Sequence, residues 1–186
     1  MAIPLKENQR YTYTDYAAWD TDIRYELIDG IPYAMASPSL KHQIVSDNLT
    51  MFFKNFLRGK VCMAISAPFD VRLNADTYDD IVVQPDLMVV CDRDKLANGK
   101  SCVGAPDLII EILPPSNNLR EMLKKMEMYR NAGVREYWVV DPDSETAQVY
   151  LLRNGEYVVR NYVETDVIPV SVVDGFEINL AEVLNE

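Results

Sequence analysis

Hydrophobic residues recur along this chain with two different spacings. Over residues 40–58 they fall three or four positions apart, which predicts an amphipathic helix that ends at Gly59. Its apolar positions are Val45, Leu49, Phe52, Phe53 and Phe56. Segments 87–90, 108–113 and 137–140 are instead almost unbroken apolar runs, which are typical of strands covered on both faces. The pattern predicts helices packed on a mixed central sheet, an α/β (α+β) fold.

Turn signals place shorter elements around this core. Asp29-Gly30 and Asn154-Gly155 each separate two strand-like segments, and each predicts a hairpin. A short helix is expected after Thr14, which would cap it, and a longer helix is expected over residues 119–133. We therefore expect one domain over 1–186. Its parts are an N-terminal hairpin extension (1–38), a core (39–140) and a C-terminal acidic β extension (141–186).

Charge limits the class of partner. The chain of 186 residues carries a net charge of −11, which argues against a protein that coats nucleic acid by bulk electrostatics. Residues 141–186 hold ten acidic and two basic residues, so most of the excess lies there. The rest of the chain is nearly balanced and leaves room for a local positive groove.

Cysteine and histidine usage bears on the compartment. Cys62, Cys91 and Cys102 are an odd number with no C-x-x-C pair, which favours reduced thiols over a disulfide framework. With His42 as the single histidine, a structural zinc site is disfavoured. No apolar run approaches the roughly 20 residues of a membrane helix, and no signal peptide is seen. We expect a cytoplasmic protein with no membrane partner.

An acidic residue stands inside one of the apolar strands. Glu111 shares a strand face with Ile109 and Leu113, and burying a lone carboxylate costs several kcal/mol, roughly, unless it is protonated, paired or bound to a cation. Asp86 and Asp107 each open an apolar strand nearby. We interpret Asp107 as a strand-initiating turn acid, because it lies four residues, or about 13 Å, from Glu111. For Asp86 a turn role and a site role both remain open.

Two carboxylates that converge near strand ends, with main-chain carbonyls beside them, make a site suited to Mg²⁺ or Mn²⁺ rather than zinc. Such an ion can lower the pKa of a bound water and neutralise charge that develops on a phosphodiester. The competing interpretation is a structural ion pair.

The helix expected over 119–133 offers a basic partner. Its buried stripe comprises Leu119, Met122, Leu123, Met126 and Tyr129. Lys125 falls at the edge of this stripe and can reach toward Glu111, whereas Lys124 points toward water. The alternatives for Lys125 are a side chain that extends into solvent and an i,i+4 pair with Glu121.

Several motifs together carry a family resemblance. They are YTYTDY, RYELIDGIPYAMASPSLKHQ, APFDVRL, VVQPDLMVVCDRDKL, GAPDLIIEILPPS and YRNAGVREYWVVDP. In this order they resemble the Uma-type putative restriction endonucleases of the PD-(D/E)XK nuclease superfamily over nearly the whole chain. The resemblance implies a restriction-endonuclease-like αβββαβ core with extra N-terminal and C-terminal strands.

The resemblance also implies roles for particular residues. Asp86 and Glu111 match the superfamily's metal-binding acids, and the carbonyl of Ile112 would add a ligand. The superfamily's lysine normally lies two residues after the second acid, where this chain has Leu113. That departure implies either lost activity or a lysine moved to the next helix, where Lys125 matches a basic position of the family; we expect the second.

Four further residues are candidates with open alternatives. Glu26 matches a family acid and could orient a water or a second ion, or it could be a surface residue of a half-exposed hairpin. Glu121 matches an acidic position that is usually Asp, so a direct role there is not expected. His42 is expected to be buried and hydrogen-bonded, with contact to substrate as the alternative. Gln84 either bonds to neighbouring backbone or lines the site.

The expected activity is metal-dependent hydrolysis of DNA phosphodiester bonds with Mg²⁺ (or Mn²⁺) as cofactor. A substrate groove would draw on basic residues after the first site strand and on the following helix, namely Arg93, Lys95, Lys100, Arg120 and Lys124. The alternative is an inactive nuclease fold that binds nucleic acid or a protein, motivated by Leu113 and the charge. A homodimer is also expected, through strands 149–152 and 157–160.

Overall fold

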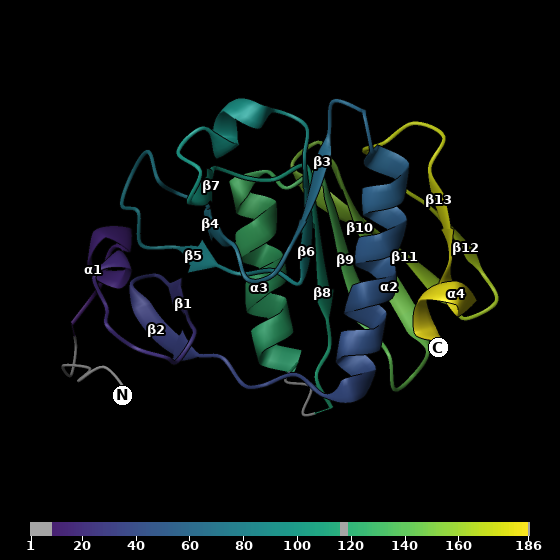
Figure 1. The fold of residues 1–186 in the computed structure, drawn as a ribbon, viewed down its shortest axis with the longest axis horizontal. Coiled ribbons are helices and arrows are strands. Elements are labelled where there is room, and N and C mark those ends of the chain that lie inside the picture. The colour runs from purple at the N-terminus through teal and green to yellow at the C-terminus, as the bar shows by residue number, and fades with distance from the viewer. Residues whose placement is uncertain (1–8, 116–118, 186) are drawn as a thin grey trace.

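The computed structural model describes residues 9–115 and 119–185 (Figure 1). A six-stranded sheet with the order β11-β10-β9-β8-β6-β3 forms its centre. The strands are β3 (Met63–Ser66), β6 (Leu87–Val90), β8 (Leu108–Ile112), β9 (Glu136–Asp141), β10 (Thr146–Arg153) and β11 (Glu156–Val163). Only β8 and β9 pair in parallel. The sheet is therefore mixed, as the sequence predicts.

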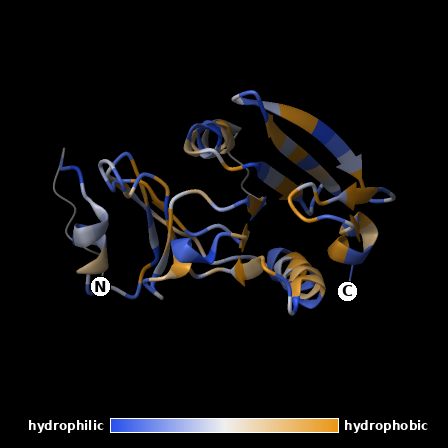
Figure 2. Ribbon diagram, turned by 90° about the horizontal axis from the view of Figure 1, so that it is seen from above, coloured by the Kyte–Doolittle hydropathy of each residue, from blue (hydrophilic) through white to orange (hydrophobic). Residues whose placement is uncertain are grey.

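Two long helices cover the opposite faces of this sheet. Figure 2 shows α2 (Leu40–Leu57) and α3 (Leu119–Ala132) on its two sides. The face toward α2 is also covered by the C-terminal elements β12 (Val167–Pro169), β13 (Glu177–Asn179) and α4 (Leu180–Leu184). The elements α2, β3, β6, β8, α3 and β9 follow one another in the predicted αβββαβ order, and the extra terminal strands flank them.

A second sheet holds the N-terminal strands and has the order β2-β1-β5-β4-β7. Its strands are β1 (Tyr25–Ile28), β2 (Ile31–Ala34), β4 (Asp70–Arg72), β5 (Val82–Val83) and β7 (Ser101–Val103). One buried cluster joins residues of both sheets with Met128 and Tyr129 of α3. Helix α3 thus lies between the two sheets (Figure 1).

Local chemistry explains how the N-terminal elements begin and turn. Asp29 and Gly30 both have positive φ, as the predicted hairpin turn between β1 and β2 requires. A Cβ at Gly30 would lie only 3.0–3.1 Å from atoms of Arg10 and Tyr11, so this turn also needs a residue without a side chain. Helix α1 (Tyr13–Ala17) is capped by Thr12, and the predicted cap at Thr14 is wrong. Asp15 decides the start, because it completes a capping box with Thr12.

Segment 61–73 divides at Ala67-Pro68 into β3 and β4, which belong to different sheets.

The expected buried stripe of α3 is wrong at one position. Leu123 is exposed, whereas Met128 is buried. Met128 is buried because α3 contacts a sheet on each side, so the buried surface of the helix extends beyond a single stripe. Helix η1 (Arg93–Leu96) follows β6.

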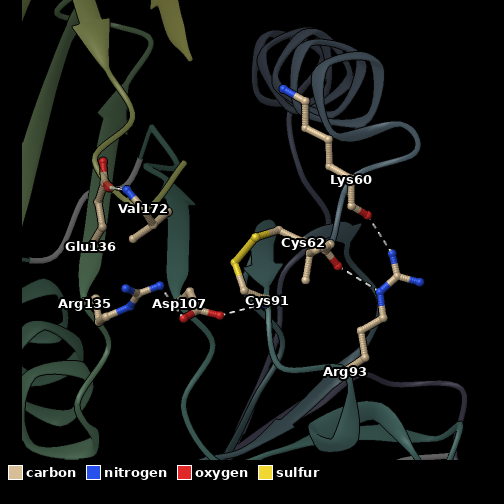
Figure 3. The surroundings of a disulfide bond; sticks show 9 residues. Lys60, Cys62, Cys91, Arg93, Asp107, Arg135, Glu136 and Val172 are labelled. Atoms are coloured by element: carbon tan, nitrogen blue, oxygen red, sulfur yellow. Dashed lines mark hydrogen bonds and ion pairs between the residues drawn. A yellow bond between two sulfur atoms is a disulfide. The ribbon is translucent and has the colours of Figure 1, made fainter. Parts of the chain in front are cut away.

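The prediction of three reduced thiols is wrong for two of them. Cys62 and Cys91 form a disulfide (Figure 3). Cys102 is a buried free cysteine. Met63 of β3 pairs with Val90 of β6, so Cys62 and Cys91 are the next opposite positions of the two strands. Because the disulfide joins two cysteines that are 29 residues apart in sequence, the absence of a C-x-x-C pair gave no information about it.

The C-terminal hairpin leaves one open edge. Residues 149–152 lie in β10 between two other strands, so the expectation that they form a dimer edge is wrong. Residues 157–160 lie in β11 at the end of the strand order. Within the described part of the chain, no helix is both long enough and apolar enough to cross a membrane.

Candidate active site

Asp86 and Glu111 meet where β6 begins and β8 ends. Leu87 pairs with Ile110 in the antiparallel register, and one step further along that register Asp86 faces Glu111. Asp86 Oδ2 accepts a hydrogen bond of 2.8 Å from the main-chain N–H of Ile112. Because opposite residues of an antiparallel pair project from one face, the two predicted carboxylates come together here.

Glu111 receives two hydrogen bonds on one oxygen. Its Oε1 accepts from the Tyr129 hydroxyl at 2.6 Å and from Lys125 Nζ at 3.1 Å, and its side chain is 13% exposed. Burial raises the pKa of Glu111, and the positive charge of Lys125 lowers it. The negative charges of Glu26 and Asp86 raise it further, so that the pKa is about 7. The carboxyl therefore gains or loses its proton near neutral pH.

Lys125 connects the two sheets through ion pairs. Its Nζ lies 3.0 Å from Glu26 Oε2 on β1 and 3.1 Å from Glu111 Oε1 on β8. Burial lowers the pKa of Lys125, but the charges of Glu111 and Glu26 outweigh it, so the pKa is raised well above its usual range. Lys125 does reach Glu111, and extension into solvent is wrong. The side chain of Glu121, the alternative partner, lies outside the described residues.

Glu26 is buried, and its interpretation as a surface residue is wrong. All four residues of β1 are buried. Glu26 Oε1 accepts hydrogen bonds from the Gln84 N–H at 3.1 Å and from Lys125 at 3.2 Å. Burial arises because β1 is covered on both faces: Leu27 packs into an aromatic cluster with Tyr11, and Ile28 packs into the cluster of α3.

His42 lies in the first turn of α2, next to Asp86. Its Nε2 is 3.3 Å from Asp86 Oδ2, and its side chain is 12% exposed. The hydrogen bond with Asp86 raises the pKa of His42; burial lowers it, and the charges of Asp86 and Glu111 add to the increase. Nδ1 is buried and finds no hydrogen-bond partner among the described residues. The ring is therefore mostly, not fully, buried, and one of its nitrogens is paired with Asp86, which agrees with the expected hydrogen bond.

Gln84 anchors the β1 side of the site. Its main-chain N–H holds Glu26, and its side-chain oxygen accepts from Arg24 Nε at 2.8 Å. Its side-chain nitrogen donates to Asp70 Oδ1 at 2.8 Å and to the Tyr16 hydroxyl at 2.9 Å. The side chain thus binds other side chains instead of backbone.

Sequence reasoning missed Tyr129 as a partner of Glu111. Burial and the charge of Glu111 raise the pKa of Tyr129 well above its usual range, so the hydroxyl remains a donor. The available signal was its spacing: Tyr129 follows Lys125 by four residues, so both reach the same surface from one helix face. Arg24, Tyr16 and Asp70 gave no sequence signal, because they join only where the second sheet forms.

The basic loop after β6 is not at this site. Arg93 donates to the carbonyl oxygens of Lys60 and Val61 at 3.1 and 2.9 Å (Figure 3). Lys95 donates to the carbonyl oxygen of Ala105 at 2.7 Å. These residues follow the end of β6 opposite to Asp86, which is why the expected groove there is wrong. Lys124 precedes Lys125 in α3, and its Nζ lies 3.5 Å from Asp29 Oδ2 on the exposed surface. The side chain of Arg120 lies outside the described residues.

Asp107 has the structural role that was expected. Its carboxylate accepts from the Cys91 N–H at 2.7 Å and pairs with Arg135 at 2.6 Å (Figure 3). These contacts occupy Asp107 at the start of β8, at the other end of the strand from Ile112.

Comparison with known proteins decides the family. The model of the family Uma2, described as "Putative restriction endonuclease", matches residues 13–181. The chain belongs to the Uma2 family. An uncharacterized protein from Synechocystis sp. is 28% identical over 158 residues, which cover 82% of this chain and 80% of that protein. The crystal structure of a protein from Anabaena variabilis, described as a putative nuclease belonging to DUF820, is similar with a TM-score of 0.75. It is 20% identical and covers 93% of this chain and 97% of that one, so it confirms the fold.

The donor set of this Uma2 protein fits a hard divalent cation. Asp86 Oδ1 and Glu111 Oε2 have no hydrogen-bond partner among the described residues. Glu26, Asp86 and Glu111 place three carboxyl groups around one lysine and one histidine, and such an excess of acid favours a cation. Residues 9–115 and 119–185 contain no cluster of three or more His, Cys, Asp or Glu side chains arranged to hold a metal. Protein ligation would therefore depend on two carboxylates and a main-chain carbonyl, with water completing the shell.

Proposed function

We propose that this Uma2 protein is a metal-dependent endonuclease that hydrolyses phosphodiester bonds of DNA. The observation that carries the proposal is the meeting of Asp86 and Glu111, on neighbouring strands, with Lys125 at one of the carboxylates. The family description and the description of the structural neighbour support the same class of activity.

In this proposal Asp86, Glu111 and the carbonyl of Ile112 hold Mg²⁺ or Mn²⁺. The ion would supply a Lewis acid and a bound water of lowered pKa. Tyr129 fixes the orientation of Glu111 by its hydrogen bond, and His42 does the same for Asp86. Both contacts leave the other oxygen of each carboxylate for the cation.

Lys125 has a second task that needs no metal ligation. Its ammonium lies at Glu111 and would orient the attacking water or stabilise negative charge on the phosphate. Glu26 holds Lys125 from the other side, so the amine is fixed between two carboxylates. The lysine absent at Leu113 is thus replaced from α3.

We further propose that the protein acts in the cytoplasm as a homodimer. The proposed DNA substrate supports an intracellular location, whereas the Cys62–Cys91 disulfide is of a kind that reducing compartments rarely keep. The edge strand β11 supports the dimer, because Val158, Val159 and Val163 are about half exposed there. Light scattering on the purified chain gives the oligomeric state: a dimer mass supports this part, and a monomer mass at working concentration rejects it.

Cleavage of supercoiled plasmid tests the activity. Wild type is expected to nick the plasmid with Mg²⁺ or Mn²⁺ and not with EDTA, whereas Glu111→Gln and Asp86→Asn are expected to lose at least about a hundredfold in rate. Glu127→Gln is the matched control, because Glu127 is an exposed acid on α3 and is expected to retain activity. Equal nicking by wild type and Glu111→Gln would indicate a contaminant. Absence of nicking by a metal-loaded wild type would favour the alternative, an inactive nuclease fold that binds nucleic acid or a protein.

A further inference from the structure

An exposed aromatic ring lies beside the candidate active site. Tyr33 of β2 pairs directly with Glu26 of β1. Side chains of directly opposite residues project from the same face of a sheet, so the ring lies next to the carboxylate that holds Lys125. Tyr33 nevertheless remains 42% exposed. Tyr33 therefore projects from the same sheet face as Glu26, and part of its ring is open to a ligand.

Lys124 extends the same surface with a positive charge. Its Nζ lies 5.5 Å from the centroid of the Tyr33 ring, and its side chain is 43% exposed. It also lies 3.5 Å from Asp29 Oδ2, an exposed pair with a small energetic effect. Because Lys124 and Lys125 are consecutive in α3, one residue borders the ring and the next enters the site.

Arg24 supplies a second cation on this face. Arg24 lies two residues before Glu26, so strand alternation places both side chains on one side of the sheet. The Met35 N–H donates to the Arg24 carbonyl oxygen, which extends the pairing of β1 with β2 to this residue. Arg24 Nε donates to Gln84, which is itself held by Asp70 and Tyr16. Among the described residues the terminal guanidinium nitrogens of Arg24 make no hydrogen bond or ion pair, so they are oriented and available.

An exposed ring with two cations on the same surface matches the chemistry of an unpaired nucleotide. Nucleobases stack on aromatic side chains, and arginine and lysine bind the phosphates beside them. Inside a duplex both faces of a base are covered by its neighbours, so a base there must leave the helix before it can stack on this ring. The net charge of −11 also weakens general attraction to a duplex backbone, which increases the relative weight of stacking.

We propose that Tyr33, Arg24 and Lys124 form a stacking platform for an unpaired nucleobase next to the cleaved phosphate, so that single-stranded or locally opened nucleic acid is the substrate. The position of the cleaved phosphate in this assignment rests on the proposed nuclease function. The test measures binding without cleavage, so the stacking platform and the nuclease function can fail separately.

The experiment measures binding of labelled 12-nucleotide DNA by fluorescence anisotropy in the Glu111→Gln background. Single-stranded DNA is expected to bind more tightly than the duplex of the same sequence. Tyr33→Leu is expected to weaken single-strand binding by about tenfold or more with little change for the duplex, whereas Tyr33→Phe stays within about threefold. Tyr78→Leu is the matched control, because Tyr78 is 79% exposed in the loop before β5.

A spectroscopic readout separates stacking from support of the hairpin. A 2-aminopurine base in the single strand is expected to lose fluorescence on binding and to keep it with Tyr33→Leu. Binding of a single-stranded RNA of the same sequence shows whether the platform accepts ribose or deoxyribose. Tighter binding of either single strand supports stacking of an unpaired base. Equal binding of single strand and duplex, or unchanged quenching and affinity with Tyr33→Leu, would overturn the assignment even if plasmid nicking is observed.

Discussion

Lys125 Nζ lies 3.1 Å from Glu111 Oε1, although 14 residues separate the two in sequence. The nuclease motif that this chain resembles would place a lysine two positions after the acid Glu111, where this chain has Leu113. Leu113 is partly buried against the core on the α3 side. A lysine from α3 thus occupies the neighbourhood of Glu111, and no second charged side chain is needed at position 113, just after β8.

Removing the charge of Lys125 should affect both activity and stability. Lys125→Met leaves Glu26 and Glu111 buried without their shared cation, so we expect a loss of about 3 kcal/mol in the free energy of unfolding and loss of nicking. Urea unfolding and the plasmid assay measure the two effects. Adding Glu26→Gln should recover part of the stability but not the activity. A Lys125→Met protein that nicks plasmid at the wild-type rate would exclude a role for the amine.

The raised pKa of Glu111 predicts how stability depends on pH. A carboxyl whose pKa is about 7 in the folded state, above its unfolded value, stabilises the fold fully below the unfolded pKa and loses that contribution as pH rises to about 7. Without divalent ions, the free energy of unfolding of wild type should fall relative to Glu111→Gln by roughly 3 kcal/mol between pH 4.5 and 8. Urea titrations at several pH values measure the difference. A constant difference would show that Glu111 ionises normally.

Tyr129→Phe tests the hydrogen bond to Glu111 alone. The hydroxyl favours the ionised carboxyl, so its loss should raise the pKa of Glu111 further. Since the proposed metal site needs the carboxylate, the rise of nicking rate with pH should move by about one unit toward alkaline pH. Rate profiles from pH 5.5 to 9 report this shift. An unchanged profile with a uniformly lower rate would indicate a packing defect instead.

The Cys62–Cys91 disulfide should contribute to stability. It closes a loop with a sequence separation of 29, for which chain entropy gives about 3–4 kcal/mol. Reduction of wild type should lower the free energy of unfolding by up to that amount. The double variant Cys62→Ser and Cys91→Ser is the control, since reductant should not change it. If reductant destabilises both proteins equally, the effect does not come from this bond.

Much of the site could be predicted from single strands and helices. Glu111 is recognisable because an acid inside an apolar strand requires compensation, and Lys125 because it lies at the edge of a helical stripe. Those features depend on spacing within one element, which the sequence displays directly. That residues 1–186 form one domain stays a prediction.

The remainder depends on contacts between elements that are distant in sequence. The burial of Glu26 requires α3 and the aromatic residues around α1 to cover both faces of β1. The pairing of Cys62 with Cys91 requires the register of β3 and β6. The hydrogen bonds of Gln84 to Arg24 and Asp70 require the second sheet to form. No local pattern encodes these relationships.

Direct measurement of cation binding tests the central claim, that Asp86 and Glu111 together hold a divalent ion. Titration calorimetry with Mn²⁺ is expected to give one site in wild type and in Glu127→Gln, and affinity at least about tenfold weaker in Asp86→Asn and in Glu111→Gln. Wild-type protein that binds no Mn²⁺, or variants of Asp86 and Glu111 that bind it as tightly as wild type does, would contradict the account.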